Sequence, residues 1–360
     1  MTTTTSLIQD WQEQLAQATA NHTPLQLCGS GSKNFYGPQA QGQVLDLRGN
    51  QGVVDYEPSE LVMVVKGGTR LSEVEALLAE RNQCLAFEPP HFGPEATIAG
   101  CIAAGLSGPR RANAGGLKDF VLGVKIIDGL GQHLSFGGQV MKNVAGYDVS
   151  RVIAGSFGSL GVIDELSIKV LPIPERTLTL QLALPQDKAL DLFNTLGGEP
   201  VAISATAWIN GKAYIRLSGA PEALMAGKNR IGGDELAESD AAQLWAQIRE
   251  QQHEWFQRKD AGHLWRLSVP STTPVIDNNA DVFVEWGGAL RWQFSTSSED
   301  EMRAQVSKVG GTANVFRAHG AVTSAFHPLP APMLRLQQRL KKAFDPAGVL
   351  NPGRLYTGVL

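Results

Sequence analysis

Glycine is concentrated in one stretch of this 360-residue chain, and that concentration limits how the stretch can fold. Fifteen of the 39 glycines lie between Gly93 and Gly161. Glycine adopts backbone conformations that other residues avoid, and it lets the backbone approach a ligand closely. The stretch is therefore predicted to fold as successive tight turns around a large ligand, and not as long regular elements.

Short apolar runs on both sides of the glycines predict an α+β lobe. Strands are expected at 44–47, 61–65, 121–127 and 162–171, with a helix at 71–80. Pro172 and Pro174 then interrupt regular pairing and indicate a domain boundary near Glu175. A chain of 360 residues is long enough for two domains, which agrees with this boundary.

After the boundary, strands alternate with helices, which predicts a second α+β domain over residues 176–330. Strands are expected at 178–184 and 214–217, and a helix at 241–256. Gly287 and Gly288 separate two apolar runs and predict a two-residue hairpin turn. The first domain then covers residues 1–175, and a C-terminal segment covers 331–360.

Composition excludes several classes of protein. Only three cysteines occur and they form no C-x-x-C pair, which argues against disulfide frameworks, zinc sites and iron–sulfur clusters. Net charge is −4 and no dense Lys/Arg cluster is present, so nucleic acid is not an expected partner. The seven histidines lack metal-ligand spacing, so no metal site is assigned. No segment reads as a signal peptide or a spanning helix, so we expect a cytoplasmic protein.

A small polar loop follows the first apolar segment and is the first candidate site. It contains Gly29, Ser30, Gly31, Ser32 and Lys33. Glycines let successive amides turn inward around an anion, while serine hydroxyls and lysine add donors and charge. The loop matches neither of the usual nucleotide-binding fingerprints, and an ordinary turn remains the alternative.

Two further segments could contact the same ligand. Pro90 and His91 precede Thr97, which could cap a helix whose first amides, with Gly100, face a pyrophosphate. A tightly packed structural helix is the alternative. Later, Asp148 could cap a helix ahead of the glycine-rich turn at 155–161, which leads into a strand at Val162.

Taken in order, these segments resemble the FAD-binding domain of the vanillyl-alcohol oxidase type, also called the PCMH type. The matching segments are Gly29 to Lys33, Ala96 to Gly100, Lys142 to Asp148, Gly155 to Val162 and the closing segment Phe344 to Arg354. The resemblance implies a two-lobed FAD-binding domain, a cap-like second domain and a C-terminal segment that packs back on the first. The FAD contacts that it implies are Gly29, Ser30, Gly31, Ser32, Lys33, Pro90, Thr97, Gly100, Gly108, Asp119, Gly158, Gly161, Val162 and Asn351.

The chain departs from the family pattern at two places. Cysteine stands at Cys28 where arginine is frequent, and Cys101 and Gly105 stand where asparagine is frequent. The early loop also lacks the histidine that anchors FAD covalently in some relatives, so the cofactor is expected to be non-covalent.

More narrowly, residues 84–161 and the segment Val284 to Trp292 resemble the FAD-binding subunits of bacterial glycolate oxidase complexes. The resemblance implies oxidation of glycolate or a related 2-hydroxy acid, a paralogous catalytic FAD subunit and an iron–sulfur subunit as partners. It is also compatible with peripheral attachment to the inner face of the plasma membrane through those partners.

Residues for the chemistry itself are harder to find. The second domain supplies the cations Arg216, Arg266, Arg291 and Arg317, which we interpret first as surface or salt-bridge residues, and no convincing base. His319 and His327 have no acidic partner of the kind that a metal site needs. No catalytic residue is assigned. The first hypothesis is thus a flavoprotein subunit that supports a paralogous catalytic subunit. The alternatives are a self-sufficient FAD-dependent hydroxy-acid or sugar oxidoreductase and an assembly module that has lost its flavin.

Overall fold

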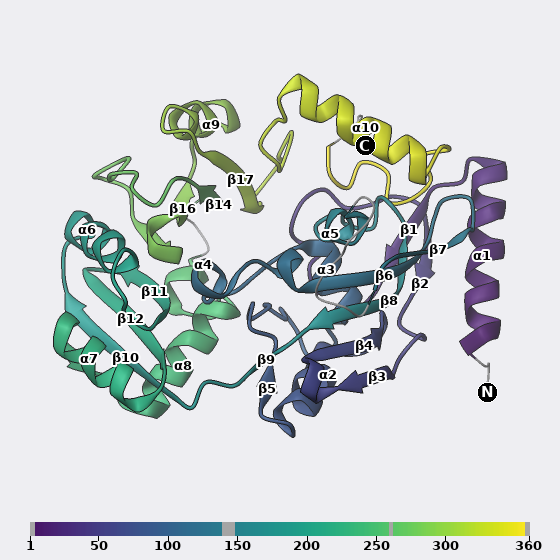
Figure 1. Cartoon of the computed structure of the whole chain (residues 1–360). Coiled ribbons are helices and arrows are strands. Elements are labelled where there is room, and N and C mark those ends of the chain that lie inside the picture. Colours follow the sequence, from purple (N-terminus) through teal and green to yellow (C-terminus); the bar gives the residue numbers. More distant parts are fainter. Residues whose placement is uncertain (1–3, 139–147, 259–261, 357–360) are drawn as a thin grey trace.

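The computed structural model describes residues 4–138, 148–258 and 262–356, and these form two lobes that lie side by side (Figure 1). The first lobe is built on a five-stranded sheet with the order β3-β4-β8-β6-β7, in which all neighbours are antiparallel. The central strand β8 is buried along almost its whole length, although half of its residues are polar, because β4 and β6 flank it on both sides. The chain up to residue 172 contains α1 (Thr4–Asn21), β1 (Leu25–Cys28), β2 (Gln43–Asp46), β3 (Val53–Glu57), η1 (Pro58–Glu60), β4 (Val62–Lys66), α2 (Leu71–Ala79), β5 (Gln83–Cys84), α3 (Ile98–Ala104), α4 (Arg111–Ala114), η2 (Leu117–Phe120), β6 (Val121–Ile127), β7 (His133–Gly137), α5 (Val149–Ile153), β8 (Val162–Lys169) and β9 (Leu171–Pro172).

The second lobe is an eight-stranded antiparallel sheet with the order β13-β10-β12-β11-β15-β16-β14-β17. Its helices and strands are β10 (Arg176–Ala183), α6 (Gln186–Gly197), β11 (Ile203–Ile209), β12 (Lys212–Gly219), α7 (Pro221–Ile231), β13 (Asp234–Glu235), α8 (Glu238–Arg249), η3 (Glu254–Gln257), β14 (His263–Ser268), β15 (Val282–Glu285), η4 (Trp286–Gly288), β16 (Leu290–Ser295), α9 (Glu299–Ser307) and β17 (Thr312–Arg317). The predicted α+β fold class is therefore confirmed. The division at 175 and 330 stays a prediction.

An aromatic core joins the two lobes. Tyr36 and Phe157 from the first lobe pack against Phe316 and Phe326 from the end of the second. The Tyr36 and Phe316 rings lie 4.6 Å apart, and the Phe157 and Phe326 rings 5.6 Å apart. Each such pair contributes about 1 kcal/mol beyond its buried area. The lobes are thus fixed to one another near the loop that follows β1.

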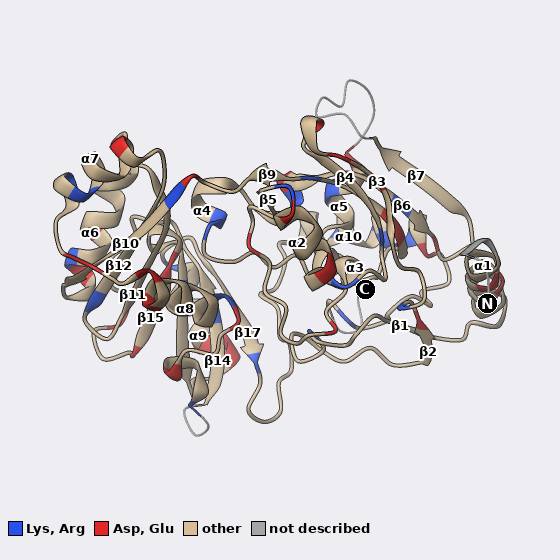
Figure 2. Cartoon of the chain, turned by 90° about the horizontal axis from the view of Figure 1, so that it is seen from below, with Lys and Arg blue, Asp and Glu red and all other residues tan. Residues whose placement is uncertain are grey.

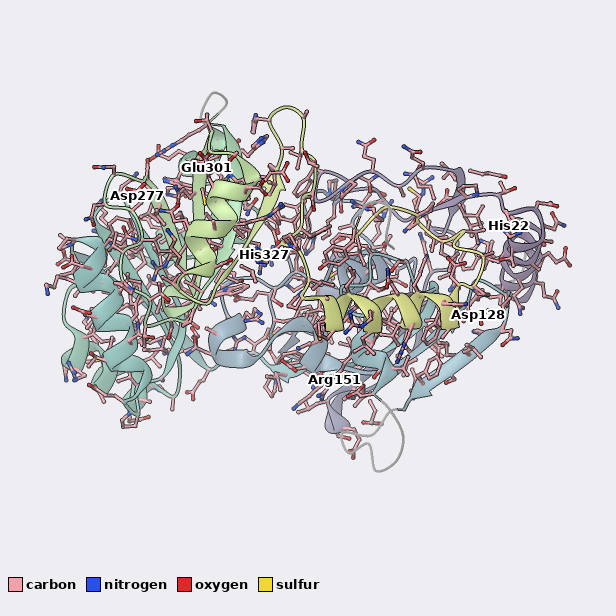
Figure 3. The ribbon with its side chains drawn as sticks, turned by 90° about the horizontal axis from the view of Figure 1, so that it is seen from above. His22, Asp128, Arg151, Asp277, Glu301 and His327 are labelled. Atoms are coloured by element: carbon pink, nitrogen blue, oxygen red, sulfur yellow. The ribbon has the colours of Figure 1, made fainter. Side chains whose placement is uncertain are left out.

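The C-terminal helix α10 (Ala331–Phe344) returns to the first lobe. In Figure 3 its C-terminal end lies beside Asp128, and the Gly129 N–H donates to the Phe344 carbonyl at 2.8 Å. After the helix, Leu350 pairs in parallel with Leu25 of β1. The strand β1 therefore lies between β2 and the segment that contains Leu350.

One sequence expectation fails in the second lobe. Glu285 pairs directly with Leu290, so the connection between β15 and β16 has four residues and not two. Trp286 adopts a left-handed φ of 54° together with Gly287 at 66°, which forms a short 3₁₀ turn. A side chain at Gly288 would come within 2.7 Å of the Ser271 carbonyl. That glycine is required by close packing, whereas the prediction attributed it to a hairpin turn.

Charged residues of both signs are interspersed over both lobes, without a field of one sign in the view of Figure 2. Among the described helices, none combines the length and apolarity needed to cross a bilayer.

Candidate functional site

The loop after β1 presents a row of unsatisfied backbone donors. The N–H groups of Gly29, Ser30, Gly31 and Lys33 donate no hydrogen bond to another described residue. Gly31 has a left-handed φ of 72°, which turns the chain back within the loop. The Ser32 N–H is held by the Ser30 hydroxyl at 3.3 Å. Unpaired amides that follow one another around a turn make an anion-binding concavity.

Lys33 is the cation of this loop, and it is nearly inaccessible to solvent. Its side chain is buried, and Nζ donates to the His91 carbonyl at 3.0 Å and to the Ser32 hydroxyl at 3.4 Å. Burial lowers the pKa of Lys33. His91 itself is structural, because its Nε2 lies 3.0 Å from the Glu75 carboxylate.

The start of α3 packs against the same loop. Thr97 caps the helix by accepting a hydrogen bond from the Gly100 N–H at 3.2 Å, as predicted. The next amides, of Ile98 and Ala99, donate to the carbonyls of Thr69 and Gly67. These two amides are therefore not free to face a pyrophosphate. The sequence had suggested that the first amides of this helix would do so. A side chain at Gly29 would approach the Thr97 hydroxyl to 2.7 Å, so helix and loop are in close contact.

The turn before β8 supplies a second group of free donors. The N–H groups of Gly158, Leu160 and Gly161 make no hydrogen bond to described residues, and the buried Ser156 hydroxyl has no partner. Unpaired buried polar atoms are costly, so a polar ligand is their natural complement.

Asn351 joins the two turns. Its Oδ1 accepts from the Leu27 N–H at 2.8 Å, and its Nδ2 donates to the Phe157 carbonyl at 2.7 Å. The closing segment was expected to bring an asparagine toward the flavin. In the structure, this asparagine holds the glycine loop and the Gly158 turn side by side.

Arg354 is a functional residue that the sequence did not single out. Its guanidinium donates to the carbonyls of Lys33 at 3.2 Å and Tyr36 at 2.7 Å, and also to that of Pro38. Burial lowers its pKa to about 10. The only sequence signal was its place at the end of the closing segment, which gave no hint that it fixes the loop after β1.

The remaining predicted contacts lie outside this arrangement. Pro90 and Gly108 line a cavity of about 30 Å³ at the junction of the lobes. Asp119, the third residue of η2, accepts from the Gly116 N–H at 2.9 Å and so caps the start of that element. Val162 is fully buried in β8. Their assignment to FAD stays a prediction.

Of the segment 142–148, only Asp148 lies within the described residues, where it caps α5.

The four arginines of the second lobe differ in their surroundings. Arg216 forms an ion pair with Glu88 at 2.9 Å, as the salt-bridge interpretation expected. Arg291 is buried and donates to the carbonyls of Gly288 and Pro274. The Arg266 guanidinium lies 5.3 Å from the Trp286 ring centroid, and that of Arg317 contacts the rings of Phe35, Phe92 and Phe316. None of these last three arginines forms an ion pair within the described residues, and the interpretation as a surface residue is wrong for the buried Arg291.

No group of three or more His, Cys, Asp or Glu side chains in the described ranges is arranged to hold a metal ion. A cavity of about 980 Å³ opens in the second lobe beside β10, α7 and α8, where Thr179, Leu224 and Trp245 line it. None of the predicted FAD contacts lines this cavity.

The comparisons with known proteins identify the family. A model described as an FAD-binding domain matches residues 5–137. Glycolate oxidase subunit GlcE of Escherichia coli K12 is 44% identical over 344 residues, which cover 96% of both chains. The chain belongs to the GlcE family of glycolate oxidase subunits.

More distant relatives agree with this assignment. Glycolate oxidase subunit GlcD of Bacillus subtilis is 29% identical over 169 residues, which cover 46% of this chain and 36% of GlcD. The structure of a 4-ethylphenol oxidase from Gulosibacter chungangensis has a TM-score of 0.68 at 14% identity, covering 96% of this chain and 87% of the oxidase, which shows the shared fold. The predicted family resemblance and FAD-binding domain are confirmed.

The residues of this GlcE-family chain fit the pyrophosphate part of FAD. Two turns present free amides, Asn351 keeps them adjacent, and Lys33 adds a desolvated positive charge. Such an arrangement favours a group with several anionic oxygens.

Replacing Gly31 by valine is expected to weaken FAD binding at least tenfold. A β-branched residue at a φ of 72° is strained by about 1–2 kcal/mol, and the loop would relax away from the conformation that presents its amides. The dissociation constant for FAD, measured by fluorescence quenching, checks this. Gly320→Val is the matched control, because Gly320 also has positive φ but faces open space in the second lobe. Equal FAD affinity in the two variants would contradict the assignment of the loop.

Proposed function

We propose that this chain is the FAD-binding subunit of a complex that oxidises glycolate to glyoxylate, and that the electrons pass to an iron–sulfur subunit. The observation that carries the proposal is the 44% identity to Escherichia coli GlcE over 96% of both chains. When bound, FAD supplies the acceptor for the two electrons of the alcohol. The residues of this chain hold its anionic groups, and no histidine occurs in the loop 28–34 to bind it covalently.

The partners follow from what this chain lacks. Three cysteines in 360 residues cannot hold the clusters of an electron-transfer chain, so the iron–sulfur centres belong to another subunit. A paralogous FAD subunit of the GlcD type is the proposed catalytic partner. We place the complex in the cytoplasm, with attachment to the inner face of the plasma membrane through its partners.

The test compares the chain alone with the assembled complex. The purified chain should be yellow and should release intact FAD on denaturation. Glycolate should bleach its flavin only when the GlcD-type and iron–sulfur subunits are present. A colourless chain that takes up no FAD would contradict the proposal. Bleaching of the isolated chain would instead support a second candidate function.

The second candidate is that this chain oxidises a 2-hydroxy acid by itself, and a buried acid favours it. Glu285 is 4% exposed, and its Oε1 accepts from the Trp292 indole N–H at 2.7 Å. It lines the junction cavity together with Arg266, Trp286 and Gly108. Burial raises the pKa of Glu285 to about 7. A carboxylate with such a pKa is suited to accept the hydroxyl proton, and Arg266 is suited to bind the substrate carboxylate.

Glu285→Gln separates the two candidates. If Glu285 is the base, the isolated chain turns over with an artificial acceptor, the rate rises with pH through about 7, and the variant loses a factor of about 10²–10⁴. If the chain only supports a partner, neither form turns over alone.

Stability provides an independent check on the buried acid. Because the folded pKa lies above the unfolded value, the wild type should lose roughly 3 kcal/mol of unfolding free energy between about pH 4.5 and 7, and Glu285→Gln should not. Denaturant titrations at several pH values measure this, and parallel pH profiles for the two proteins would refute the raised pKa.

A further inference from the structure

We propose that Arg317 and Lys33 form an anion clamp across the junction of the two lobes, which takes a phosphate or carboxylate group of the bound ligand. The inference deepens the proposed function and rests on it for the identity of the ligand. It assigns to the second lobe a direct part in ligand binding.

The first observation is that Arg317 has no polar partner. It ends β17, and its guanidinium lies 4.7 Å from the Phe35 ring centroid, 5.6 Å from that of Phe92 and 5.8 Å from that of Phe316. The guanidinium makes no hydrogen bond or ion pair within the described residues. Burial alone lowers its pKa to about 10, and no carboxylate contributes to the shift.

The second observation is that Lys33 approaches the same aromatic ring from the first lobe. Its Nζ lies 5.8 Å from the Phe92 centroid. The Glu250 carboxylate, which acts on Lys33 electrostatically, already accepts from the N–H groups of His91 and Phe92 and pairs with Arg249. Two desolvated cations therefore lie around Phe92, beside a loop whose amides are free.

Two partly desolvated cations close to one ring favour the binding of a group that compensates their charge. Cation–π contacts offset part of the cost of partly burying a guanidinium, but aromatic rings give its N–H donors no oxygen acceptor. Arginine binds planar or tetrahedral oxyanions through paired hydrogen bonds, which aromatic rings cannot supply. An anion bound at the junction, with oxygens that reach both lobes, would supply these acceptors.

Two sources could supply this anion: a phosphate of FAD on the amides of the loop 29–33, or the carboxylate of a 2-hydroxy acid. In either case, Arg317 would draw the second lobe onto the ligand. Ligand binding would then stiffen the junction between the lobes.

Arg317→Met tests the clamp, because methionine fills a similar volume without the charge. The dissociation constant for FAD, and that for oxalate measured from the spectrum of the bound flavin, are compared with those of the wild type. We expect one of them to rise by about tenfold to a hundredfold. The melting temperature of the FAD-free variant should equal or exceed that of the wild type, because a desolvated charge is gone.

The melting temperature distinguishes a ligand clamp from a structural residue. Arg317→Lys should restore part of the affinity. Arg230→Gln is the matched control, since Arg230 is an exposed arginine of α7 in the second lobe, paired with Glu199. Weaker FAD binding identifies the phosphate source, and weaker oxalate binding alone identifies the carboxylate source. Unchanged affinity for both, or a lower melting temperature of the FAD-free variant, overturns the proposal.

A failure of the proposed function can be distinguished from a failure of the clamp by testing whether the wild-type chain binds FAD. A wild-type chain that takes up no FAD contradicts the function, and inorganic pyrophosphate then serves as the probe. A thermal shift with pyrophosphate that Arg317→Met abolishes would still support the clamp, and no shift in the wild type would overturn it as well.

Discussion

Replacing Asn351 by leucine is expected to lower the free energy of unfolding by about 3–8 kcal/mol and to leave the purified protein with little FAD. The change removes the acceptor of the Leu27 N–H and the donor to the Phe157 carbonyl, and each unsatisfied buried group costs about 1–3 kcal/mol. Leucine at a φ of 42° adds about 1–2 kcal/mol of backbone strain. Because domains are stable by only about 5–15 kcal/mol, this is a large fraction of the total.

Denaturant unfolding and the ratio of flavin to protein absorbance measure the two effects. Asn351→Gly is the matched variant, because glycine tolerates the backbone conformation while losing both hydrogen bonds. A smaller loss of stability in Asn351→Gly than in Asn351→Leu would indicate that backbone strain contributes. Wild-type stability together with wild-type flavin content in Asn351→Leu would contradict the bridging role of this side chain.

Replacing Asp345 by alanine is expected to cost about 3–5 kcal/mol of unfolding free energy. Asp345 is 1% exposed, and its carboxylate accepts from Lys341 Nζ at 2.7 Å and from the N–H groups of Val349 and Leu350. Its removal leaves a buried ammonium with two carbonyl partners, of Ser159 and Leu350, and no counter-charge. The C-terminal segment would then detach from the turn before β8.

The double variant Asp345→Ala with Lys341→Met tests this explanation. Removing both charges should recover part of the loss, because no unpaired ion remains buried. Thermal unfolding of the wild type, the two single variants and the double variant gives the coupling energy. Additive losses would show that the ion pair is not the cause.

The first-lobe site was largely predictable because its signals are local. The adjacent glycines and serines of Gly29 to Lys33 indicate by themselves that several backbone amides can converge on one ligand. Likewise, Thr97 directly precedes the helix that it caps. The strand at 121–127 was also placed correctly, since a continuous apolar run between turn residues leaves few alternatives.

The junction could not be predicted, because its contacts join residues that are remote in sequence. Arg354 reaches Lys33 across 321 positions, and Arg317 meets Phe35 only after an entire sheet has folded. In the sequence, Glu285 is a single polar residue at the end of an apolar strand. Nothing in the sequence predicts that the Trp292 indole N–H donates a hydrogen bond to its carboxylate. At the start of α3, the sequence predicted the Thr97 cap. It did not predict that the carbonyls of Thr69 and Gly67 accept hydrogen bonds from the first amides of the helix, because those residues lie in another part of the chain.

The place of Leu350 beside β1 has a consequence for biosynthesis. The glycine loop follows β1 and is synthesised early. The strand β1 pairs with β2, but its neighbour on the other side, the segment at Leu350, is synthesised more than 300 residues later. During translation, the early segment can collapse around its own apolar residues, yet it lacks Asn351 and Arg354 to set the loop. Cofactor loading is therefore expected to follow synthesis of Asn351 and Arg354, and a ribosome-bound nascent chain lacking these two residues is expected to remain without flavin.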